Sequence, residues 1–227
     1  MMWRDLIEQQ GFATIPAVLS AIEVEALLQQ LSQRPLPRSR AGMRHALRHP
    51  AIAQLASDSR LLAIAQGVLG GTAFPFRATV FDKSRNANWL VVWHQDTALP
   101  LCERREVAGW GPWSVKEGIA YAHAPTSALT QVLALRVHLD DSTAGNGPLR
   151  VLPGTHAHGV LSDDEVYQLS LKTPATDCLI PKGGVLAMRP LLIHASSKSV
   201  SEMSRRVVHI EYAITKSIGD GLELVLA

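Results

Sequence analysis

The chain has 227 residues, of which 47% are hydrophobic and 19% are charged, and its formal net charge is only +2. This composition suits a globular protein with a sizeable core, and it excludes a broadly disordered chain. The scattered basic residues lack the electrostatic footprint of a nucleic-acid binder, and two cysteines, Cys102 and Cys178, are too few for a disulfide framework.

The chain is expected to be cytoplasmic, with neither a leader segment nor a membrane span. The first ten residues, MMWRDLIEQQ, carry charges where a signal peptide has its apolar region. No uninterrupted apolar run approaches the roughly 18 residues that a membrane-spanning helix needs. Its length favours one domain over residues 1–227.

The first seventy residues are predicted to be helical. Ser20 and Glu23 have the S-x-x-E spacing of a capping box, and apolar residues follow at helical spacing. The stretch SDSRLLAIAQGVLGG, residues 57–71, has a polar cap, an apolar helix and a Gly-Gly stop. We therefore expect residues 1–72 to form a helical part that packs on a sheet.

From residue 73 onward the pattern changes to short apolar runs bounded by Gly, Pro, Asn and Asp. These runs are FPFRATVF, WLVVWH, GIAYAHA, QVLALRVHL, PLRVLP, DCLIP, GVLAMR, LLIHAS and RRVVHIEYAI. Only SDDEVYQLS, residues 162–170, has helical spacing in this part. A series of short strands separated by turns indicates a β-sandwich or barrel rather than alternating βαβ units.

Two H-x-D pairs occur in the strand-rich part, His94 with Asp96 and His138 with Asp140. Side chains two apart on a strand project from the same face, so either pair can present an imidazole and a carboxylate to one metal. A second imidazole, for which His194 is the best candidate, completes the 2-His-1-carboxylate triad of a non-haem Fe(II) oxygenase. In a jelly roll the paired ligands lie early and the lone histidine late, which favours His94 and Asp96. We interpret His138 as a strand end that enters a turn.

Three motifs in a fixed order resemble the phytanoyl-CoA dioxygenase family of Fe(II)/2-oxoglutarate oxygenases. They are WHQD, GNGPLRVLPGTHAHG and GGVLAMRPLLIHASSKSVSEMSRRVVHIEYA. The resemblance implies a double-stranded β-helix (jelly roll, cupin-like) over residues 73–227 with covering α-helices. It also implies Fe(II) as cofactor, 2-oxoglutarate and O2 as cosubstrates, and His94, Asp96 and His194 as catalytic iron ligands.

The same resemblance assigns residues to 2-oxoglutarate. The family anchors this cosubstrate with an arginine eleven residues after the distal histidine, which is Arg205 here, and a guanidinium matches the geometry of a carboxylate. Its neighbour Arg206 projects from the opposite face of the strand, so only one of the two can serve, and we favour Arg205. Ser196 matches a hydroxyl that contacts 2-oxoglutarate in relatives, although a turn-forming serine is the alternative. Arg136 stands where better-known relatives have a tryptophan near the cosubstrate.

Residues 97–118 are long for a connection between strands, and we predict that they cover the metal as a lid or binding loop. Trp113 and Lys116 of this stretch are predicted to contact an apolar or anionic substrate. In the alternative interpretation, the tryptophans of the stretch only anchor it on the barrel.

The sequence is thus interpreted as an Fe(II)/2-oxoglutarate-dependent dioxygenase that hydroxylates a small molecule and releases succinate and CO2. The carboxylate of Asp96 favours hydroxylation, because halogenating relatives leave that position vacant. Two alternatives are a cupin-type metal enzyme that does not use 2-oxoglutarate, which has no need of Arg205 beside the metal, and a non-catalytic binding protein with a degenerate site. The sequence names neither the substrate nor the oligomeric state.

Overall fold

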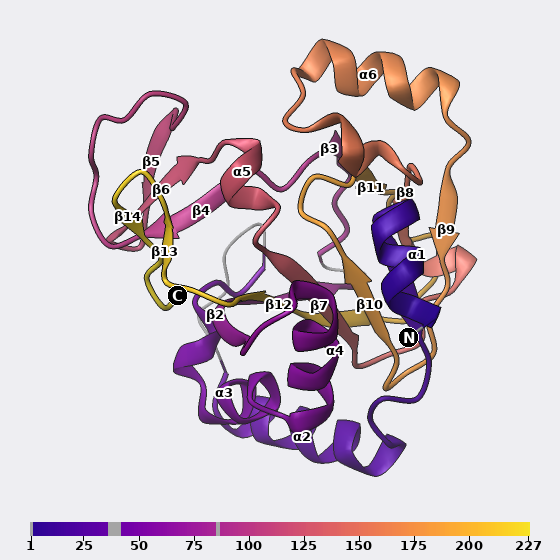
Figure 1. Ribbon diagram of the computed structural model, residues 1–227. Helices are drawn as coiled ribbons and strands as arrows, with labels where there is room; N and C mark the ends of the chain where they lie inside the picture. The colour runs from indigo at the N-terminus through magenta and orange to yellow at the C-terminus, as the bar shows by residue number, and fades with distance from the viewer. Residues whose placement is uncertain (1, 36–41, 85–86) are drawn as a thin grey trace.

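The structure of the chain is a computed structural model, and it describes residues 2–35, 42–84 and 87–227 (Figure 1). The helices of the first part are α1 (Met2–Gln10), α2 (Ala21–Gln33), α3 (Pro50–Ala56) and α4 (Ser59–Leu69). The predicted capping box starts α2: Ser20 Oγ accepts from the Glu23 N–H at 3.3 Å, and Glu23 Oε2 accepts from the Ser20 N–H at 2.7 Å. As predicted, α4 ends at Gly70, whose φ of 77° lies in the left-handed region that glycine adopts without strain.

Two antiparallel sheets face each other and form a jelly roll, which confirms the predicted fold class. The larger sheet has the order β1-β10-β7-β12-β2, formed by Phe12–Ile15, Val185–Met188, Leu133–His138, Arg205–Ala213 and Phe74–Lys83. The smaller sheet has the order β3-β11-β8-β9, formed by Val91–His94, His194–Ser196, Leu149–Val151 and Thr176–Cys178.

One strand of the larger sheet comes from the part of the chain that was predicted to be helical. β1 pairs with β10, with Phe12 opposite Met188 and Ile15 opposite Val185. The expectation of a helical stretch up to residue 72 was therefore wrong at this point. The four residues FATI are too few to show a clear alternation, and their pairing partner lies near the other end of the chain.

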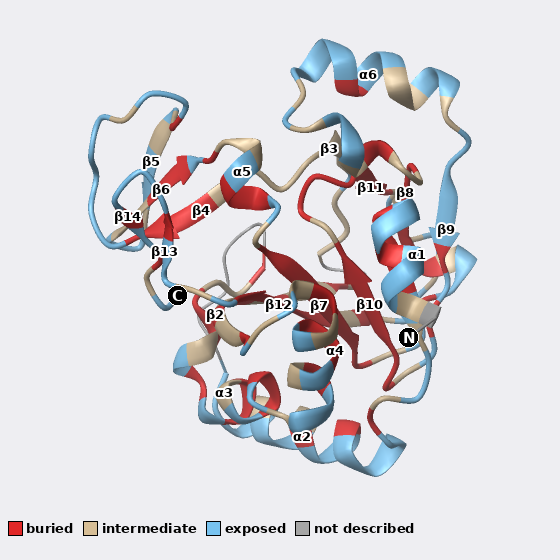
Figure 2. Cartoon of the chain, viewed as in Figure 1, coloured by how far each residue is buried: buried red, intermediate tan, exposed pale blue. Residues whose placement is uncertain are grey.

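Helices α2, α3 and α4 cover the outer face of the larger sheet (Figures 1 and 2). Val208, Ile210 and Tyr212 of β12 are fully buried in the core that these helices share with the sheet. Complete burial of one such side chain stabilises the fold by roughly 1.5–3 kcal/mol. Since side chains alternate along a strand, the residues between them face the space between the two sheets.

The remaining elements form two small sheets, two α-helices and three short 3-10 helices, which span Ala46–Arg48, Ala144–Asn146 and Thr155–His158. β4 (Ala98–Leu101), β6 (Ile119–His123) and β5 (Trp113–Lys116) form a three-stranded sheet, so the stretch 97–118 that was predicted as a loop contains two strands. β13 (Ser217–Gly219) pairs with β14 (Leu222–Glu223). The predicted helix over 162–170 is α6 (Asp163–Lys172), whereas α5 (Thr126–Leu129) was not predicted.

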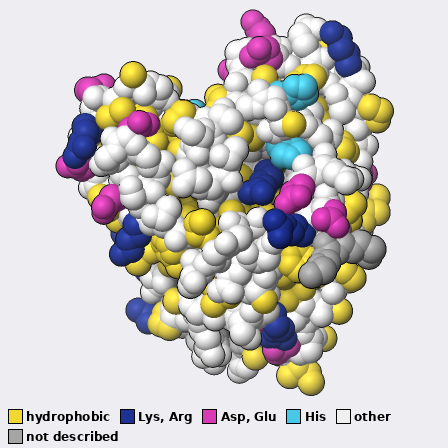
Figure 3. Space-filling model, in the orientation of Figure 1, with side chains coloured by type: hydrophobic (Ala, Val, Ile, Leu, Met, Phe, Trp, Pro, Cys, Tyr) yellow, Lys and Arg dark blue, Asp and Glu magenta, His cyan; other side chains and the backbone are white. Residues whose placement is uncertain are grey.

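The surface is notched between the part that carries the three-stranded sheet and the part that carries α6 (Figure 3). Several large apolar side chains of α6 and of the adjoining strand β3 are exposed, among them Val92, Tyr167 and Leu171.

In the described ranges, no helix combines the length and apolar character needed to cross a membrane.

Candidate active site

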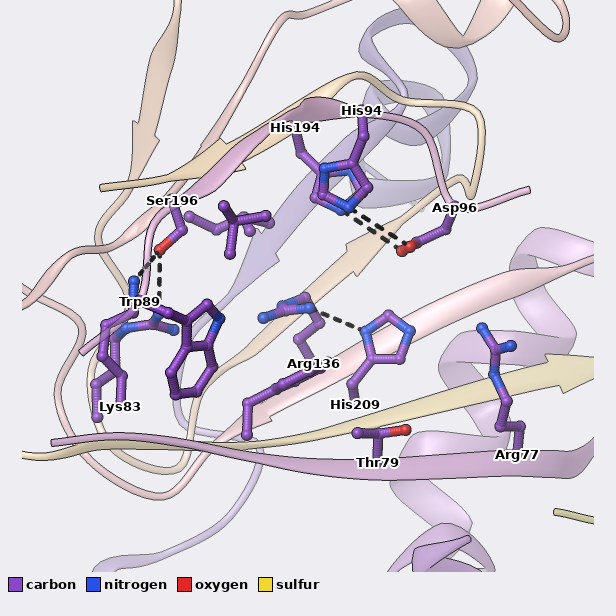
Figure 4. A pocket seen from close by; sticks show the side chains of 14 residues that line it. Arg77, Thr79, Lys83, Trp89, His94, Asp96, Arg136, His194, Ser196 and His209 are labelled. Carbon is purple, nitrogen blue, oxygen red and sulfur yellow. Dashed lines mark hydrogen bonds and ion pairs between the residues drawn. The ribbon is translucent and has the colours of Figure 1, made fainter. Parts of the chain in front are cut away.

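His94, Asp96 and His194 come together where β3 and β11 pair (Figure 4). His94 and His194 are direct partners in the register of these strands, and their ring centroids are 4.2 Å apart. Asp96 Oδ1 lies 3.8 Å from His94 Nε2, and Asp96 Oδ2 lies 3.5 Å from His194 Nε2. One potential ligand atom from each residue lies within 4.8 Å of the others, which is the spacing of donors around a single metal ion.

Hydrogen bonds to the backbone fix the orientation of both imidazoles. His94 Nδ1 donates to the Val92 carbonyl at 2.8 Å, and His194 Nδ1 donates to the Leu192 carbonyl at 2.9 Å. Because a carbonyl only accepts, each Nδ1 carries a proton, and in the neutral imidazole the lone pair is then on Nε2, the atom on the side of Asp96. Metal-binding histidines are oriented in this way, so the donor set fits Fe(II).

The protonation states of the cluster also suit a cation. Burial raises the pKa of the Asp96 carboxyl, but His194 and His94 outweigh this effect and hold that pKa below its ordinary value. Burial lowers the pKa of His194 to about 3. At neutral pH, therefore, Asp96 is a carboxylate and His194 is a neutral imidazole, which are the forms that bind a metal.

A cavity of about 230 Å³ lies between the two sheets beside this triad. Its floor is the inward face of β2, β12 and β7, and its apolar lining includes Phe81, Trp89, Val91 and Leu149. Asp96 is the one carboxylate among the described residues that line the cavity. The lining also contains four cationic side chains, those of Arg77, Lys83, Arg136 and Arg205. The cavity is therefore electrostatically suited to anions.

Lys83 and Ser196 lie at the end of the cavity opposite Asp96 (Figure 4), and Arg205 contacts Ser196 there. Lys83 and Arg205 are register partners at the ends of β2 and β12. Lys83 Nζ donates to Ser196 Oγ at 2.7 Å and to the Ser197 carbonyl at 2.6 Å, and Arg205 Nη2 lies 3.4 Å from the same hydroxyl. Burial, together with the neighbouring charge of Arg205, lowers the pKa of Lys83 to about 8.

The loop that contains Gly147 supports this end of the cavity. The Gly147 carbonyl accepts from Ser196 Oγ at 2.9 Å. Gly147 has a φ of 67°, and a Cβ atom on it would lie 2.4 Å from the Ser197 carbonyl oxygen and 3.3 Å from Lys83 Nζ. Only glycine therefore lets the loop approach Ser196 and Lys83 this closely.

Among the described residues, the second H-x-D pair is not part of a group that could hold a metal ion. Asp140 accepts from Arg206 Nε at 2.8 Å and from Arg206 Nη2 at 2.7 Å, which holds Arg206 away from the cavity that Arg205 lines. His138 is the last residue of β7, as interpreted, but it is buried and neither of its ring nitrogens has a hydrogen-bond partner in the described structure. Burial lowers its pKa to about 3.

Trp113 and Lys116 are not among the described residues that line the cavity. Both belong to β5, an edge strand of the three-stranded sheet, where Lys116 Nζ lies 4.6 Å from the centroid of the Tyr121 ring. The alternative interpretation fits Trp110, whose side chain is buried and whose Nε1 donates to Asp220 Oδ2 at 2.9 Å.

The sequence analysis missed several residues that line the cavity, above all Lys83, Arg77 and His209. A signal for Lys83 and Arg77 exists in the strand FPFRATVFDK. Arg77, Thr79 and Lys83 share one face of the strand with Phe81. The apolar Ala78 and Val80 lie on the other face, with Asp82 after them. Charges on one face of a strand whose other face is mostly apolar indicate a functional interior rather than a solvent-exposed edge.

A jelly roll that holds two histidines and a carboxylate between its sheets defines the class of mononuclear non-haem metal oxygenases. The family model for phytanoyl-CoA dioxygenase (PhyH) matches residues 7–207. The chain therefore belongs to the phytanoyl-CoA dioxygenase family of Fe(II)/2-oxoglutarate oxygenases, which confirms the predicted family and enzyme class.

Characterised relatives agree with this assignment. The chain is 25% identical to the L-proline trans-4-hydroxylase of Streptomyces griseoviridis over 242 residues, which cover 90% of this chain and 82% of that protein. It is 24% identical to the ectoine dioxygenase of Halomonas elongata over 168 residues, which cover 67% of this chain and 44% of that protein.

Solved structures share the fold. AviO1 from Streptomyces viridochromogenes Tue57 superposes with a TM-score of 0.67 at 21% identity, covering 93% of each chain. EctD from S. alaskensis, crystallised with 2-oxoglutarate and 5-hydroxyectoine, superposes with a TM-score of 0.69 at 18% identity, covering 93% of this chain and 75% of that one.

Proposed function

We propose that the chain, acting as one oxygenase domain over residues 1–227, uses Fe(II), 2-oxoglutarate and O2 to hydroxylate a small molecule, with release of succinate and CO2. One observation carries the proposal: the 2-His-1-carboxylate cluster and an end lined by buried cations occupy the same cavity. Similarity to an L-proline hydroxylase and to ectoine dioxygenases supports a small-molecule substrate.

His94, Asp96 and His194 are the proposed iron ligands. Their two imidazole Nε2 atoms and one carboxylate would hold Fe(II), and such a set of three ligands would leave room for cosubstrate and oxygen. When bound, Fe(II) supplies the chemistry that couples decarboxylation of 2-oxoglutarate to oxidation of a C–H bond. The backbone hydrogen bonds at both Nδ1 atoms keep the two imidazoles in the ligating tautomer before the metal arrives.

Lys83 and Arg205 are the proposed partners of the distal carboxylate of 2-oxoglutarate. Both side chains are buried, and neither forms an ion pair with a carboxylate in the described part of the chain. Arg205 Nη1 is buried without any hydrogen-bond partner there. Since an unpaired buried cation is costly, a bound carboxylate would remove that cost. Ser196, which accepts from Lys83 and donates to Gly147, positions the ammonium group.

Anaerobic titration of 2-oxoglutarate into the iron-loaded protein, followed by the metal-to-ligand absorption band, tests the proposal. Arg205→Gln is expected to weaken 2-oxoglutarate binding by about tenfold or more, the loss typical of a charge-assisted hydrogen bond. Arg206→Gln is the matched control, because its guanidinium pairs with Asp140 outside the cavity.

The titration and an assay of succinate formation separate the two alternatives. A cupin-type enzyme that does not use 2-oxoglutarate would bind iron and show no titration with 2-oxoglutarate. A non-catalytic binding protein would form no succinate from 2-oxoglutarate when iron and oxygen are supplied. Equal titrations for Arg205→Gln and the wild type would contradict the assigned cosubstrate site.

A further inference from the structure

Arg136 is a buried cation that the proposed iron and 2-oxoglutarate sites do not use. It lies on β7 with 6% of its surface exposed, and it lines the cavity. Its Nη1 donates to His209 Nδ1 at 3.0 Å, whereas its Nε is buried without a hydrogen-bond partner in the described structure. None of the described carboxylates forms an ion pair with it. Donors of its guanidinium are therefore available to a ligand.

The strand register places Arg136 nearer the middle of the cavity than Lys83 and Arg205. Arg136, His209 and Thr79 are neighbours across β7, β12 and β2. Lys83 and Arg205 lie four residues further along their strands, which is roughly 13 Å at the rise of a β-strand. The Arg136 guanidinium reaches over the Phe81 ring, with its Cζ 5.3 Å from the ring centroid, and faces the cavity between Trp89 and His209 (Figure 4).

The charges of the proposed site leave Arg136 without a counter-charge. Arg77 is neutralised by an ion pair with the buried Glu211. Fe(II), Asp96 and the two carboxylates of 2-oxoglutarate together carry one net negative charge, which Lys83 and Arg205 already exceed. A third buried cation is therefore balanced only if another anion enters the cavity.

We propose that the substrate is a small molecule with an apolar body and a carboxylate, and that Arg136 binds this carboxylate. The inference rests on the proposed function and names the substrate class of the same site. A guanidinium offers two parallel donors to a carboxylate, and the bond to His209 limits the rotation of this one. Phe81, Val91 and Leu149 line the cavity and contact the apolar body.

Two probes that differ only in charge test the substrate class. Pentanoate and pentanamide are titrated calorimetrically into the anaerobic protein loaded with Fe(II) and saturated with 2-oxoglutarate. The wild type is expected to bind pentanoate about tenfold more tightly than pentanamide or better, as a charge-assisted hydrogen bond predicts. Arg136→Gln should abolish this preference, Arg136→Lys should retain part of it, and the control Arg206→Gln should retain all of it.

Two further measurements distinguish a loss of pentanoate binding from a loss of folding and from a loss of 2-oxoglutarate binding. Thermal unfolding of Arg136→Gln is expected at the wild-type temperature or above, because the substitution removes an unpaired buried charge. Arg136→Gln should lose more affinity for pentanoate than for 2-oxoglutarate, and Arg205→Gln should show the reverse order.

Three results would overturn the inference. They are equal binding of the two probes by the wild type, no binding of either, and a loss of 2-oxoglutarate affinity in Arg136→Gln as large as in Arg205→Gln. The last result would make Arg136 a ligand of the cosubstrate. If the wild type bound no 2-oxoglutarate at all, the proposed function would fail instead, and the preference for pentanoate in the metal-loaded protein would still test Arg136.

Discussion

The ammonium group of Lys83 donates to the hydroxyl of Ser196 at 2.7 Å, across 113 positions of the sequence and from one sheet of the jelly roll to the other. Lys83 ends β2 of the larger sheet, and Ser196 ends β11 of the smaller one. Both side chains are buried, and the hydroxyl donates a hydrogen bond to the Gly147 carbonyl. The contact therefore closes one end of the cavity and presents a cation to whatever enters it.

Lys83→Met should weaken 2-oxoglutarate binding by about tenfold or more, since it removes one charged donor from the proposed carboxylate site. The measurement is the anaerobic titration of the iron-loaded variant. Lys182→Met is the control, because Lys182 forms a partly exposed ion pair with Glu25. Unchanged 2-oxoglutarate affinity in Lys83→Met would remove Lys83 from the site.

The affinity for 2-oxoglutarate should depend on pH through Lys83. Burial, followed by the charges of Arg205 and Arg136, lowers the pKa of Lys83 from 10.5 to about 8. The ammonium is charged below about pH 8 and loses its proton above it, so binding should be strongest below that pH and weaken as the pH rises through it. The pKa of Arg205, lowered by burial to about 10, keeps that side chain charged over this interval.

The same titration in Lys83→Met provides the control for the pH effect, and its affinity should stay nearly constant between about pH 7 and pH 9. Between about pH 8 and 10.5 the unfolded chain binds a proton that folded Lys83 has released. This group therefore makes the folded protein more stable as the pH rises through that interval. A wild-type affinity for 2-oxoglutarate that does not change up to pH 9 would contradict the assignment of Lys83 to the cosubstrate site.

Iron binding should depend on the first H-x-D pair, His94 and Asp96, and should not depend on His138 of the second. Reconstituted wild-type protein is expected to hold about one Fe(II) per chain, and His94→Ala and Asp96→Ala should lose it, because each removes one of three ligands. His138→Ala should keep its iron, since His138 lies outside the cluster. Iron analysis after anaerobic desalting measures this, and retention by His94→Ala with loss by His138→Ala would reverse the assignment.

Removing only the cation of the ion pair between Arg77 and Glu211 should destabilise the fold strongly. Arg77→Met leaves the fully buried Glu211 carboxylate without its cation, at a cost of about 3–5 kcal/mol in the free energy of unfolding. The double variant Arg77→Met with Glu211→Met should recover most of this loss, because it removes both charges. Urea denaturation measures each value.

Arg60→Met is the matched surface control for this ion pair. Arg60 pairs with Glu23 and Asp58 at partly exposed positions, so its loss should cost about 1 kcal/mol or less. If the double variant were no more stable than Arg77→Met alone, the cost would come from lost packing and not from the unpaired carboxylate.

Local signals in the sequence were sufficient for the helices α2, α4 and α6, most strands and the pairing of His94 with Asp96. A capping box joins residues three apart, and an H-x-D pair on a strand needs only the alternation of its side chains. His194, at the end of a later apolar run, was the best candidate for the second imidazole, and the order of the three motifs implied the same residue. Each of these inferences depends on residues close together in the chain or on motifs whose order the family preserves.

Tertiary structure decided which other polar residues share the cavity with this triad. The segment β1 is recognised as a strand only from its pairing with β10. Lys116 lies on β5 rather than at the cavity wall. No motif in the sequence assigns a ligand role to Lys83 or Arg136. They become a cosubstrate ligand and a substrate ligand in our proposals only because β2, β7 and β11 meet around one space. The physical reason is that sheet pairing and the packing of one sheet on another join strands far apart in the chain, and no short window of sequence records those distances.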